Sequence, residues 1–179
     1  MAYFKKLVGD KCHLSPIDTD DASAFTEWLN DPEVAAGLGV TRRILNVAGE
    51  RDALAKLAAR PYHFAIVALE GDRLLGSCGI DDVSAVDRTG RLGILIGDKR
   101  FWDRGFGTDA VRLLLRFAFL TLNLNNIKLT AHAFNERAIR CYEKCGFKRC
   151  GVWPDSRYHD GALHANVFMY LLRADFAAG

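Results

Sequence analysis

The sequence predicts an α/β protein with a mixed sheet, and three observations lead to this fold class. Apolar segments typical of strands alternate along the chain with segments whose apolar residues recur at helical spacing. Two hairpin signals, Glu70-Gly71-Asp72 and Asp160-Gly161, each lie between a pair of apolar strands. Between these hairpins the order is strand, helix, strand, helix, which favours parallel as well as antiparallel pairing.

The first part of the chain is expected to contain a strand, two helices and a hairpin. Asp18 or Thr19 can cap the first helix, and Asp31-Pro32 closes it. The expected elements are a strand at His13–Ile17, a helix through Ala22, Phe25, Trp28 and Leu29, a second helix from Val47 to before Pro61, and strands at Phe64–Leu69 and Leu74–Ile80.

The second part is expected to alternate strands and helices before it closes with the second hairpin. Asp109, Arg112 and Arg116 form one polar stripe on an otherwise buried helix. Asn135 can cap the next helix, and Gly146 can end it. The expected strands are Arg91–Gly97, Ile127–Ala133, a segment around Val152, and Leu163–Leu172.

Length and charge restrict the class of protein. A chain of 179 residues fits one domain over residues 1–179 and is long enough to bury a core. Its net charge of +2 comes from interspersed acids and bases, so we expect neither nucleic acid nor a membrane as a partner. The start, MAYFKKLVGD, has too short an apolar stretch for a signal peptide, and Arg112 and Arg116 interrupt the longest apolar run. A cytoplasmic location is therefore expected.

The five cysteines are odd in number and include no CxxC pair. Cys141 and Cys145 are spaced to share a helix face, but a metal site would need two further ligands. We therefore expect free, buried thiols in a reducing compartment, and no metal.

Two glycines, Gly105 and Gly107, stand where a strand leads into a helix. Such a turn can bind an anion, because the first N–H groups of a helix are unpaired and glycine lets a phosphate approach the backbone. Arg104 can add a positive charge. A turn that needs glycine for its geometry alone is the alternative. A dinucleotide fingerprint, Gly105-x-Gly107-x-x-Ala110, fails because the following strand, IKLTAHAFN, contains no acidic residue.

Three longer stretches carry a resemblance to a known family. They are DDASAFTEWLNDPEV near the start, GDKRFWDRGFGTDAVRLLLRFAF in the middle, and NERAIRCYEKCGF followed by a YHDG hairpin. With these motifs the chain resembles the GNAT superfamily of N-acetyltransferases nearly end to end. It is most similar to the branch of ribosomal-protein N-terminal acetyltransferases and their small-molecule relatives. The resemblance implies a mixed, mostly antiparallel sheet with splayed central parallel strands and flanking helices, and acetyl-CoA as the acetyl donor.

The resemblance assigns acetyl-CoA binding to the glycine turn and to the strand before it. In the family the turn binds the pyrophosphate, and backbone groups at the strand end bind the pantetheine arm and the thioester carbonyl. Trp102 replaces the family's usual Gln or Arg three residues before the first glycine. The residues concerned are Leu95, Ile96 and Gly97 in the strand, and Trp102, Asp103, Arg104, Gly105, Phe106, Gly107 and Thr108 in the turn. By itself, RLGILIG is more typical of a plain buried strand than of a cofactor-binding segment.

Tyr142 and Asn135 each have a structural and a functional interpretation. Tyr142 shares a helix face with Ala138 and Ile139, which is typical of a core tyrosine with a satisfied hydroxyl. The resemblance implies instead that Tyr142 protonates the departing CoA thiolate. Asn135 is a natural N-cap, and in the family the matching Asn also contacts the cofactor.

The general base is not determined by the motifs. Some relatives use a Glu on the strand after the cofactor helix, but Thr130 occupies that place here. Strand alternation puts His132 on the same face as Thr130, so we predict His132 as the base. Ordinary surface histidine is the alternative, and a water chain, Asp81, Asp82 and His159 also remain candidates.

The acceptor is expected near Trp28, Tyr158 and His159, by family precedent. Many relatives follow YHD with a second acidic residue, whereas LHAN follows here. A protein N-terminus, a free amino acid and an aminosugar or other small amine all remain open as acceptors, and the protein is expected to be a monomer or a homodimer. The alternative class is a non-catalytic acyl-CoA-binding or regulatory protein with the same fold.

Overall fold

The computed structural model describes residues 3–176, which form two compact units. Unit 1 contains the described residues up to Gly79 together with Ile94–Ala110, and unit 2 contains Ile80–Gly93 and the described residues from Val111 onward. Two strands and one helix run from one unit into the other. The single domain expected over residues 1–179 stays a prediction.

Unit 1 is built on antiparallel strands. The strands pair in the order β1 (Leu7–Val8), β2 (Cys12–Ser15), β3 (His63–Ala68) and the first part of β4 (Leu74–Ser84). All of β2 is buried, as is β3 after its first residue, so these two strands form the centre of the unit. The expected hairpin between β3 and β4 is confirmed, and the two-residue β1 was not predicted.

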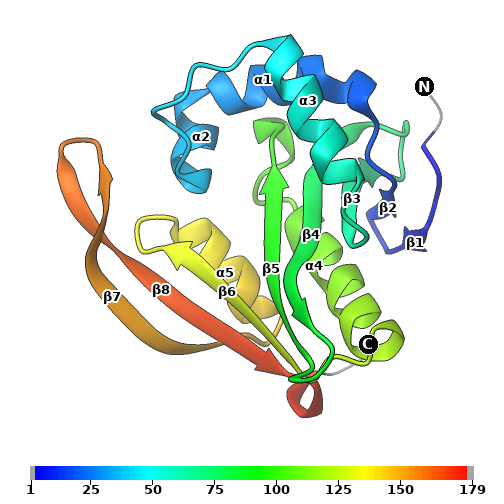
Figure 1. Cartoon of the computed structure of the whole chain (residues 1–179), viewed down its shortest axis with the longest axis vertical. Coiled ribbons are helices and arrows are strands. Elements are labelled where there is room, and N and C mark those ends of the chain that lie inside the picture. The colour runs from blue at the N-terminus through cyan, green and yellow to red at the C-terminus, as the bar shows by residue number, and fades with distance from the viewer. Residues whose placement is uncertain (1–2, 177–179) are drawn as a thin grey trace. The chain divides into compact units, whose positions relative to one another are not determined.

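Three helices belong to unit 1: α1 (Ala22–Asn30), α2 (Pro32–Leu38) and α3 (Val47–Ala58). Asp18 begins the segment before α1, since its side chain accepts a hydrogen bond from the Asp20 N–H at 2.9 Å. α1 and α3 lie side by side (Figure 1), and Phe25 and Leu54 pack in their shared core.

The sequence analysis expected two helices here and was wrong about α2. Asp31 ends α1, but its carboxylate also accepts hydrogen bonds from the N–H groups of Glu33 and Val34 at 2.9 and 3.3 Å. Asp31 is therefore the N-cap of a new helix with Pro32 in its first turn, a position that proline favours.

Unit 2 contains the only parallel pair among the described strands. β5 (Thr89–Ile96) pairs in parallel with β6 (Asn126–His132) over its first three residues, Thr89–Arg91. β6 pairs antiparallel with β8 (Ala162–Leu172), and β8 pairs antiparallel with β7 (Lys148–His159). The mixed, mostly antiparallel sheet expected from the resemblance is thus confirmed. In Figure 1, β7 and β8 form one long hairpin in orange and red, and α5 (Glu136–Lys144) lies beside β6.

Local capping in unit 2 follows the sequence closely. The Asn135 side chain accepts a hydrogen bond from the Ala138 N–H at 3.1 Å, so its capping role is confirmed. Gly146 ends α5 in the left-handed region at φ 93°, and the Phe147 N–H donates to the Tyr142 carbonyl at 3.1 Å. Asp160 and Gly161 both have positive φ, as a two-residue hairpin turn requires.

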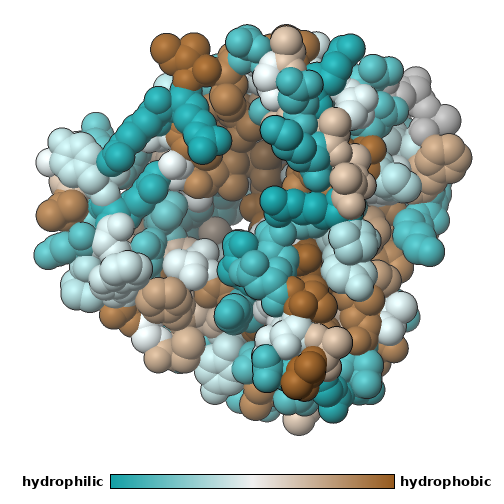
Figure 2. All heavy atoms as spheres, in the orientation of Figure 1, coloured by the Kyte–Doolittle hydropathy of each residue, from teal (hydrophilic) through white to brown (hydrophobic). Residues whose placement is uncertain are grey.

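The surface is mixed in character, as the composition indicates. Figure 2 shows hydrophilic and hydrophobic residues interspersed over the face in view. None of the helices within residues 3–176 is long and apolar enough to cross a membrane. Cys12, Cys78 and Cys145 are buried as expected, whereas Cys141 is half-buried and Cys150 is exposed, because Cys150 lies on β7, whose residues are mostly exposed.

Candidate functional site

The glycine turn of unit 1 forms through two residues with left-handed backbone conformation. Asp103 has φ 55° and Gly105 has φ 86°, and α4 (Phe106–Arg116) begins immediately afterwards. Glycine adopts this conformation freely, whereas a residue with a Cβ is strained in it by ~1–2 kcal/mol. The turn therefore reverses the chain within four residues and presents the N-terminus of α4.

A tryptophan holds this turn against the end of β5. The Trp102 indole N–H donates a hydrogen bond of 2.7 Å to the Ile96 carbonyl. The Gly97 N–H donates to the Leu75 carbonyl at 2.8 Å. Two of the backbone groups that the resemblance assigned to the cofactor, Ile96 C=O and Gly97 N–H, thus already have a partner in the chain.

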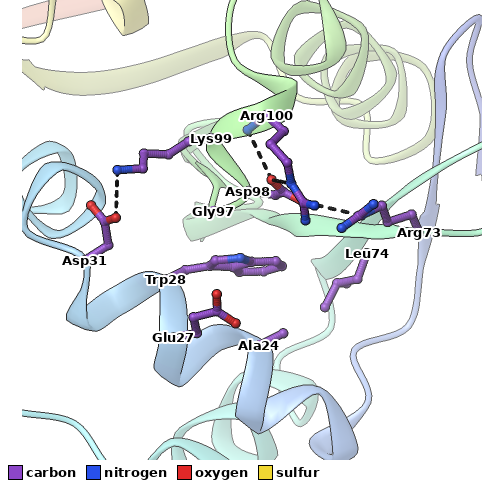
Figure 3. Close-up of a pocket in the computed structure, with 10 residues that line it drawn as sticks. All are labelled: Ala24, Glu27, Trp28, Asp31, Arg73, Leu74, Gly97, Asp98, Lys99 and Arg100. Carbon is purple, nitrogen blue, oxygen red and sulfur yellow. Dashed lines mark hydrogen bonds and ion pairs between the residues drawn. The ribbon is translucent and has the colours of Figure 1, made fainter.

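Gly97 also lets an aromatic ring approach the strand end. A Cβ at this position would overlap the Trp28 indole, so only glycine allows the ring to lie there. Figure 3 shows the Trp28 ring directly beside Gly97 and Asp98. Trp28 and Gly97, which the sequence analysis placed with the acceptor and the cofactor respectively, are therefore neighbours in unit 1.

A pocket of about 510 Å³ opens at this point in unit 1. Its apolar wall includes Trp28 and Leu74, and ion pairs border it (Figure 3). Asp98 is only 6% exposed and pairs with Arg100 at 2.8 Å and with Arg73 at 3.4 Å. The hydrogen bond from Arg100 holds the pKa of Asp98 below its usual range. The pocket is lined by Ala24, Glu27, Trp28, Asp31, Arg73, Leu74, Gly97, Asp98, Lys99 and Arg100.

Lysine 11 is a cation beside the turn that sequence reasoning missed. Its ammonium nitrogen lies 5.7 Å from the centre of the Phe106 ring, and its side chain passes close to Gly105. Arg104 lies near the turn as predicted, with its guanidinium 5.4 Å from the centre of the Phe101 ring. Nothing in the sequence pattern indicates that residue 11 reaches a helix almost a hundred residues later.

Asp109 explains how Lys11 comes to that place. Its carboxylate accepts hydrogen bonds from the backbone N–H groups of Asp10, Lys11 and Cys12, at 3.2, 2.9 and 3.0 Å. The sequence analysis assigned Asp109 to the polar stripe of α4, on which Arg112 and Arg116 are exposed as expected. Asp109 in fact ties the loop between β1 and β2 to the first turn of α4.

The predicted base, His132, lies in unit 2 at the end of β6. Its Nδ1 is 2.7 Å from Oδ1 of Asn166, the residue directly opposite on β8. Burial lowers the pKa of His132, the hydrogen bond with Asn166 offsets part of this effect, and the nearby charges of Arg157 and His159 lower the pKa further. The histidine is therefore neutral at physiological pH, as a base must be.

Aromatic rings surround His132. The Phe134 ring is stacked with both His132 and His159, with ring centres 5.3 and 4.8 Å apart. The His164 ring meets Phe134 edge-on at 5.0 Å. Tyr158, predicted near the acceptor, is 54% exposed on β7.

Tyr142 is buried in α5, with 7% of its surface exposed. Its ring meets Phe147 edge-on at 5.9 Å, a contact that suits a core residue. Burial raises the pKa of the Tyr142 hydroxyl, so the group keeps its proton at neutral pH. Both the structural and the catalytic interpretation of Tyr142 are compatible with this environment.

Asp81 and Asp82, two of the other candidate bases, are both paired with one arginine. Arg91 binds Asp82 at 2.7 Å and Asp81 at 3.4 Å within unit 2. Among residues 3–176, no group of three or more His, Cys, Asp or Glu side chains is arranged to hold a metal ion.

The predicted site residues therefore fall into two groups. Within unit 1 the structure joins Trp28 to Gly97 and Trp102 to Ile96, and within unit 2 it joins His132 to His159 through Phe134. The unit 1 group is Trp28, Leu95–Gly97 and 102–108, and the unit 2 group is His132, Asn135, Tyr142, Tyr158 and His159. Lys11, Asp109, Phe134 and Asn166 were not predicted as parts of these groups.

Comparison with protein families identifies the class. The acetyltransferase (GNAT) domain matches residues 11–148, more than three quarters of the chain. The chain belongs to this family of acetyltransferases.

Individual relatives agree with this assignment. "Uncharacterized N-acetyltransferase p20" of Bacillus licheniformis is 26% identical over 177 residues, which cover 96% of this chain and 98% of the relative. "Putative ribosomal N-acetyltransferase YdaF" of Bacillus subtilis (strain 168) is 31% identical over 103 residues, or 58% of this chain and 56% of the relative. The crystal structure of spermidine N-acetyltransferase from Vibrio cholerae, in complex with CoA and spermine, matches with a TM-score of 0.81 at 19% identity, over 92% of this chain and 96% of that one. At this identity the structural match confirms the fold.

Proposed function

We propose that this protein transfers the acetyl group of acetyl-CoA to a primary amine by direct attack. Family membership supports acetyl transfer in general. The observation that best supports acetyl-CoA as the acetyl donor is the hydrogen bond from Trp102 to the Ile96 carbonyl. This bond holds the end of β5 and the glycine turn in a fixed relation within unit 1. A thioester arm and a pyrophosphate of the same molecule need two such binding segments in fixed relation.

The pyrophosphate would bind at the first turn of α4. Backbone N–H groups at a helix N-terminus point outward and the helix dipole favours an anion there. Gly105 and Gly107 keep Cβ atoms away from the phosphate oxygens, and Lys11 and Arg104 supply positive charge beside the turn. The thioester would then reach the end of β5 at Leu95–Gly97, beside the pocket that Trp28 lines.

The transfer step needs one proton acceptor and one proton donor. The amine nitrogen attacks the thioester carbon, the new C–N bond forms, and the C–S bond breaks when the tetrahedral intermediate collapses. In the proposal His132 takes the proton that the amine nitrogen loses, and Tyr142 gives its proton to the CoA thiolate. His132 is suited to the first role by its lowered pKa, and Tyr142 to the second by a raised pKa that keeps its hydroxyl protonated.

The acceptor is proposed as a primary amine without further restriction. The names of the relatives point to different amines, a ribosomal protein in one case and spermidine in another. A protein N-terminus, a free amino acid and an aminosugar or other small amine are therefore all included. No disulfide joins the cysteines within residues 3–176, as is usual in a reducing compartment, and we propose that the protein acts in the cytoplasm as a monomer or homodimer.

A release assay for free CoA thiol tests the proposal. Purified protein is mixed with acetyl-CoA and, in turn, with spermidine, alanine, glucosamine and a peptide with an N-terminal serine. Thiol release that depends on one of these amines, with the acetylated amine seen by mass spectrometry, supports the enzyme. Tight acetyl-CoA binding without transfer to any of a broad panel of amines would favour a non-catalytic acyl-CoA-binding protein instead.

A further inference from the structure

His132 and Asn166 face each other across two strands of unit 2. They are directly paired residues of β6 and β8, and the next residue along, Ala133, donates its N–H to the Ala165 carbonyl at 2.9 Å. The backbone pairing thus fixes the separation of the two side chains. Both side chains are half-buried, so water competes only in part for their hydrogen bond.

The hydrogen bond between them has a defined direction. The atom of Asn166 that lies 2.7 Å from His132 Nδ1 is the amide oxygen, which can only accept. With the amide of Asn166 oriented in this way, Nδ1 carries the hydrogen. In a neutral imidazole the other nitrogen, Nε2, then holds the lone pair.

Neighbouring rings restrict the orientation of the His132 imidazole. Phe134 stacks on it at an interplanar angle of 22°, and the same Phe134 ring stacks with His159 at 25°. A 180° flip of the His132 ring would put Cδ2 in the place of Nδ1 and lose the hydrogen bond to Asn166. The stacking and the hydrogen bond therefore favour one ring orientation together.

The charged and titratable groups around His132 are also identifiable. Arg157 and His159 come from β7 and both disfavour a positive charge on His132, while His164 of β8 lies against Phe134. Asn166 is uncharged and is the partner that favours protonation of the ring. Asn166 thus favours one tautomer, while burial of the ring, helped by Arg157 and His159, disfavours its charged form.

We propose that Asn166 is a positioning residue that holds His132 in the Nδ1–H tautomer, so that Nε2 is free to take a proton from the acceptor amine. The inference rests on the proposed function for its catalytic meaning. The tautomer itself is a property of the protein without substrate. This difference separates a failure of the inference from a failure of the proposed function.

Nitrogen-15 NMR of the histidine side chains, at a pH above their titration, tests the tautomer directly. We expect a protonated, pyrrole-type Nδ1 and an unprotonated, pyridine-type Nε2 for His132. Asn166→Leu should shift this pattern toward Nε2–H, whereas Asn166→Asp should keep it. Asn125→Leu, the same chemical change at an exposed position of unit 2, should leave it unchanged.

Kinetics with the panel amine of highest turnover then test the role. Asn166→Leu should lower kcat/KM at least about tenfold and move the inflection of its pH profile, and Asn166→Asp should restore part of the rate with the inflection at higher pH, because a carboxylate stabilises the imidazolium. A wild-type His132 in the Nε2–H form overturns the inference even if Asn166→Leu fails to fold. A slower Asn166→Leu enzyme with an unmoved inflection also overturns it, since that effect would be structural. Absence of acetyl transfer to every panel amine overturns the proposed function and the catalytic role with it.

Discussion

The two units provide their candidate site residues in different ways. Unit 1 relies on backbone: a strand end, two left-handed residues and the start of a helix, held by the bond from Trp102 to Ile96. Unit 2 relies on side chains, with His132 held by Asn166 and stacked on Phe134, and Tyr142 buried in α5. We infer that unit 1 mainly determines the binding of acetyl-CoA and that unit 2 mainly determines proton transfer. Substitutions in the two units should therefore change different measured quantities.

Tyr142→Phe should give the largest effect. The change keeps the ring and its contact with Phe147 and deletes only the hydroxyl. General acid catalysis is worth ~10²–10⁴-fold, so turnover should fall at least about tenfold even if water replaces part of the function. Acetyl-CoA affinity, measured by calorimetry, should stay near wild type.

Stability separates the catalytic from the structural interpretation of Tyr142. Removal of the hydroxyl should change the free energy of unfolding by no more than the net worth of one hydrogen bond, ~0.5–1.5 kcal/mol. A variant with normal turnover and a slightly lower melting temperature would show that Tyr142 is a core residue. Unit 2 would then no longer supply the proposed proton donor.

The backbone features of both units were largely predictable from the sequence, because their signals are local. The hairpin turns, the Asn135 cap and the Gly146 terminator depend on residues within a few positions of one another. Asp31-Pro32 shows the limit, since the same dipeptide that ends α1 also starts α2.

The side-chain partners were not predictable in the same way. Asn166 meets His132 only through the register of β6 with β8, 34 residues apart, and Asp109 meets Lys11 at a separation of 98. Register and helix docking depend on the whole hydrophobic core, which no short motif encodes.

Asp109→Ala should give the next largest effect, and the quantities that change should be the melting temperature and the affinity for acetyl-CoA. The change leaves the N–H groups of Asp10, Lys11 and Cys12 without their acceptor. Hydrogen bonds to a charged group are worth ~1.5–3 kcal/mol, so the melting temperature should fall by roughly 3–12 °C for a chain of this size. Acetyl-CoA affinity should also decrease, because Lys11 is no longer held beside Gly105 and Phe106.

Arg112→Ala is the matched control for Asp109→Ala, since Arg112 is exposed on the same helix. It should change neither stability nor affinity appreciably. Full affinity in a folded Asp109→Ala protein would show that the loop does not contribute to binding.

Two histidines, one in each unit, should affect the protein differently as the pH changes. His13 in unit 1 is fully buried and neither of its ring nitrogens has a hydrogen-bond partner among residues 3–176, whereas His132 in unit 2 has Asn166. Burial lowers the pKa of His13 below its usual value of 6.5, more than Asp72 raises it. Because the unfolded chain then binds more protons, stability is full above about pH 6.5 and decreases as the pH falls toward the folded pKa.

His13→Leu should therefore reduce the loss of stability between pH 7 and pH 5, measured by urea unfolding as a difference from wild type. His132→Ala should act mainly on the pH profile of turnover. If His13→Leu shows the same acid sensitivity as wild type, burial of this ring does not cause the pH dependence.

The smallest expected effect concerns the conformation of the turn itself. Asp103 has φ 55°, where glycine is unstrained and alanine is not. Asp103→Gly should be nearly neutral, because relief of strain offsets the greater freedom of glycine in the unfolded chain, and Asp103→Ala should be less stable than Asp103→Gly by about 1 kcal/mol.

The same two substitutions at Asp52, inside helix α3, should give the opposite order by a similar amount, since glycine is the poorer helix residue. Thermal melts of the four variants measure this reversal, which corresponds to roughly 2–4 °C at each position. If alanine equals or exceeds glycine at position 103, the left-handed turn does not form as described, and unit 1 would not present the backbone on which its role in binding depends.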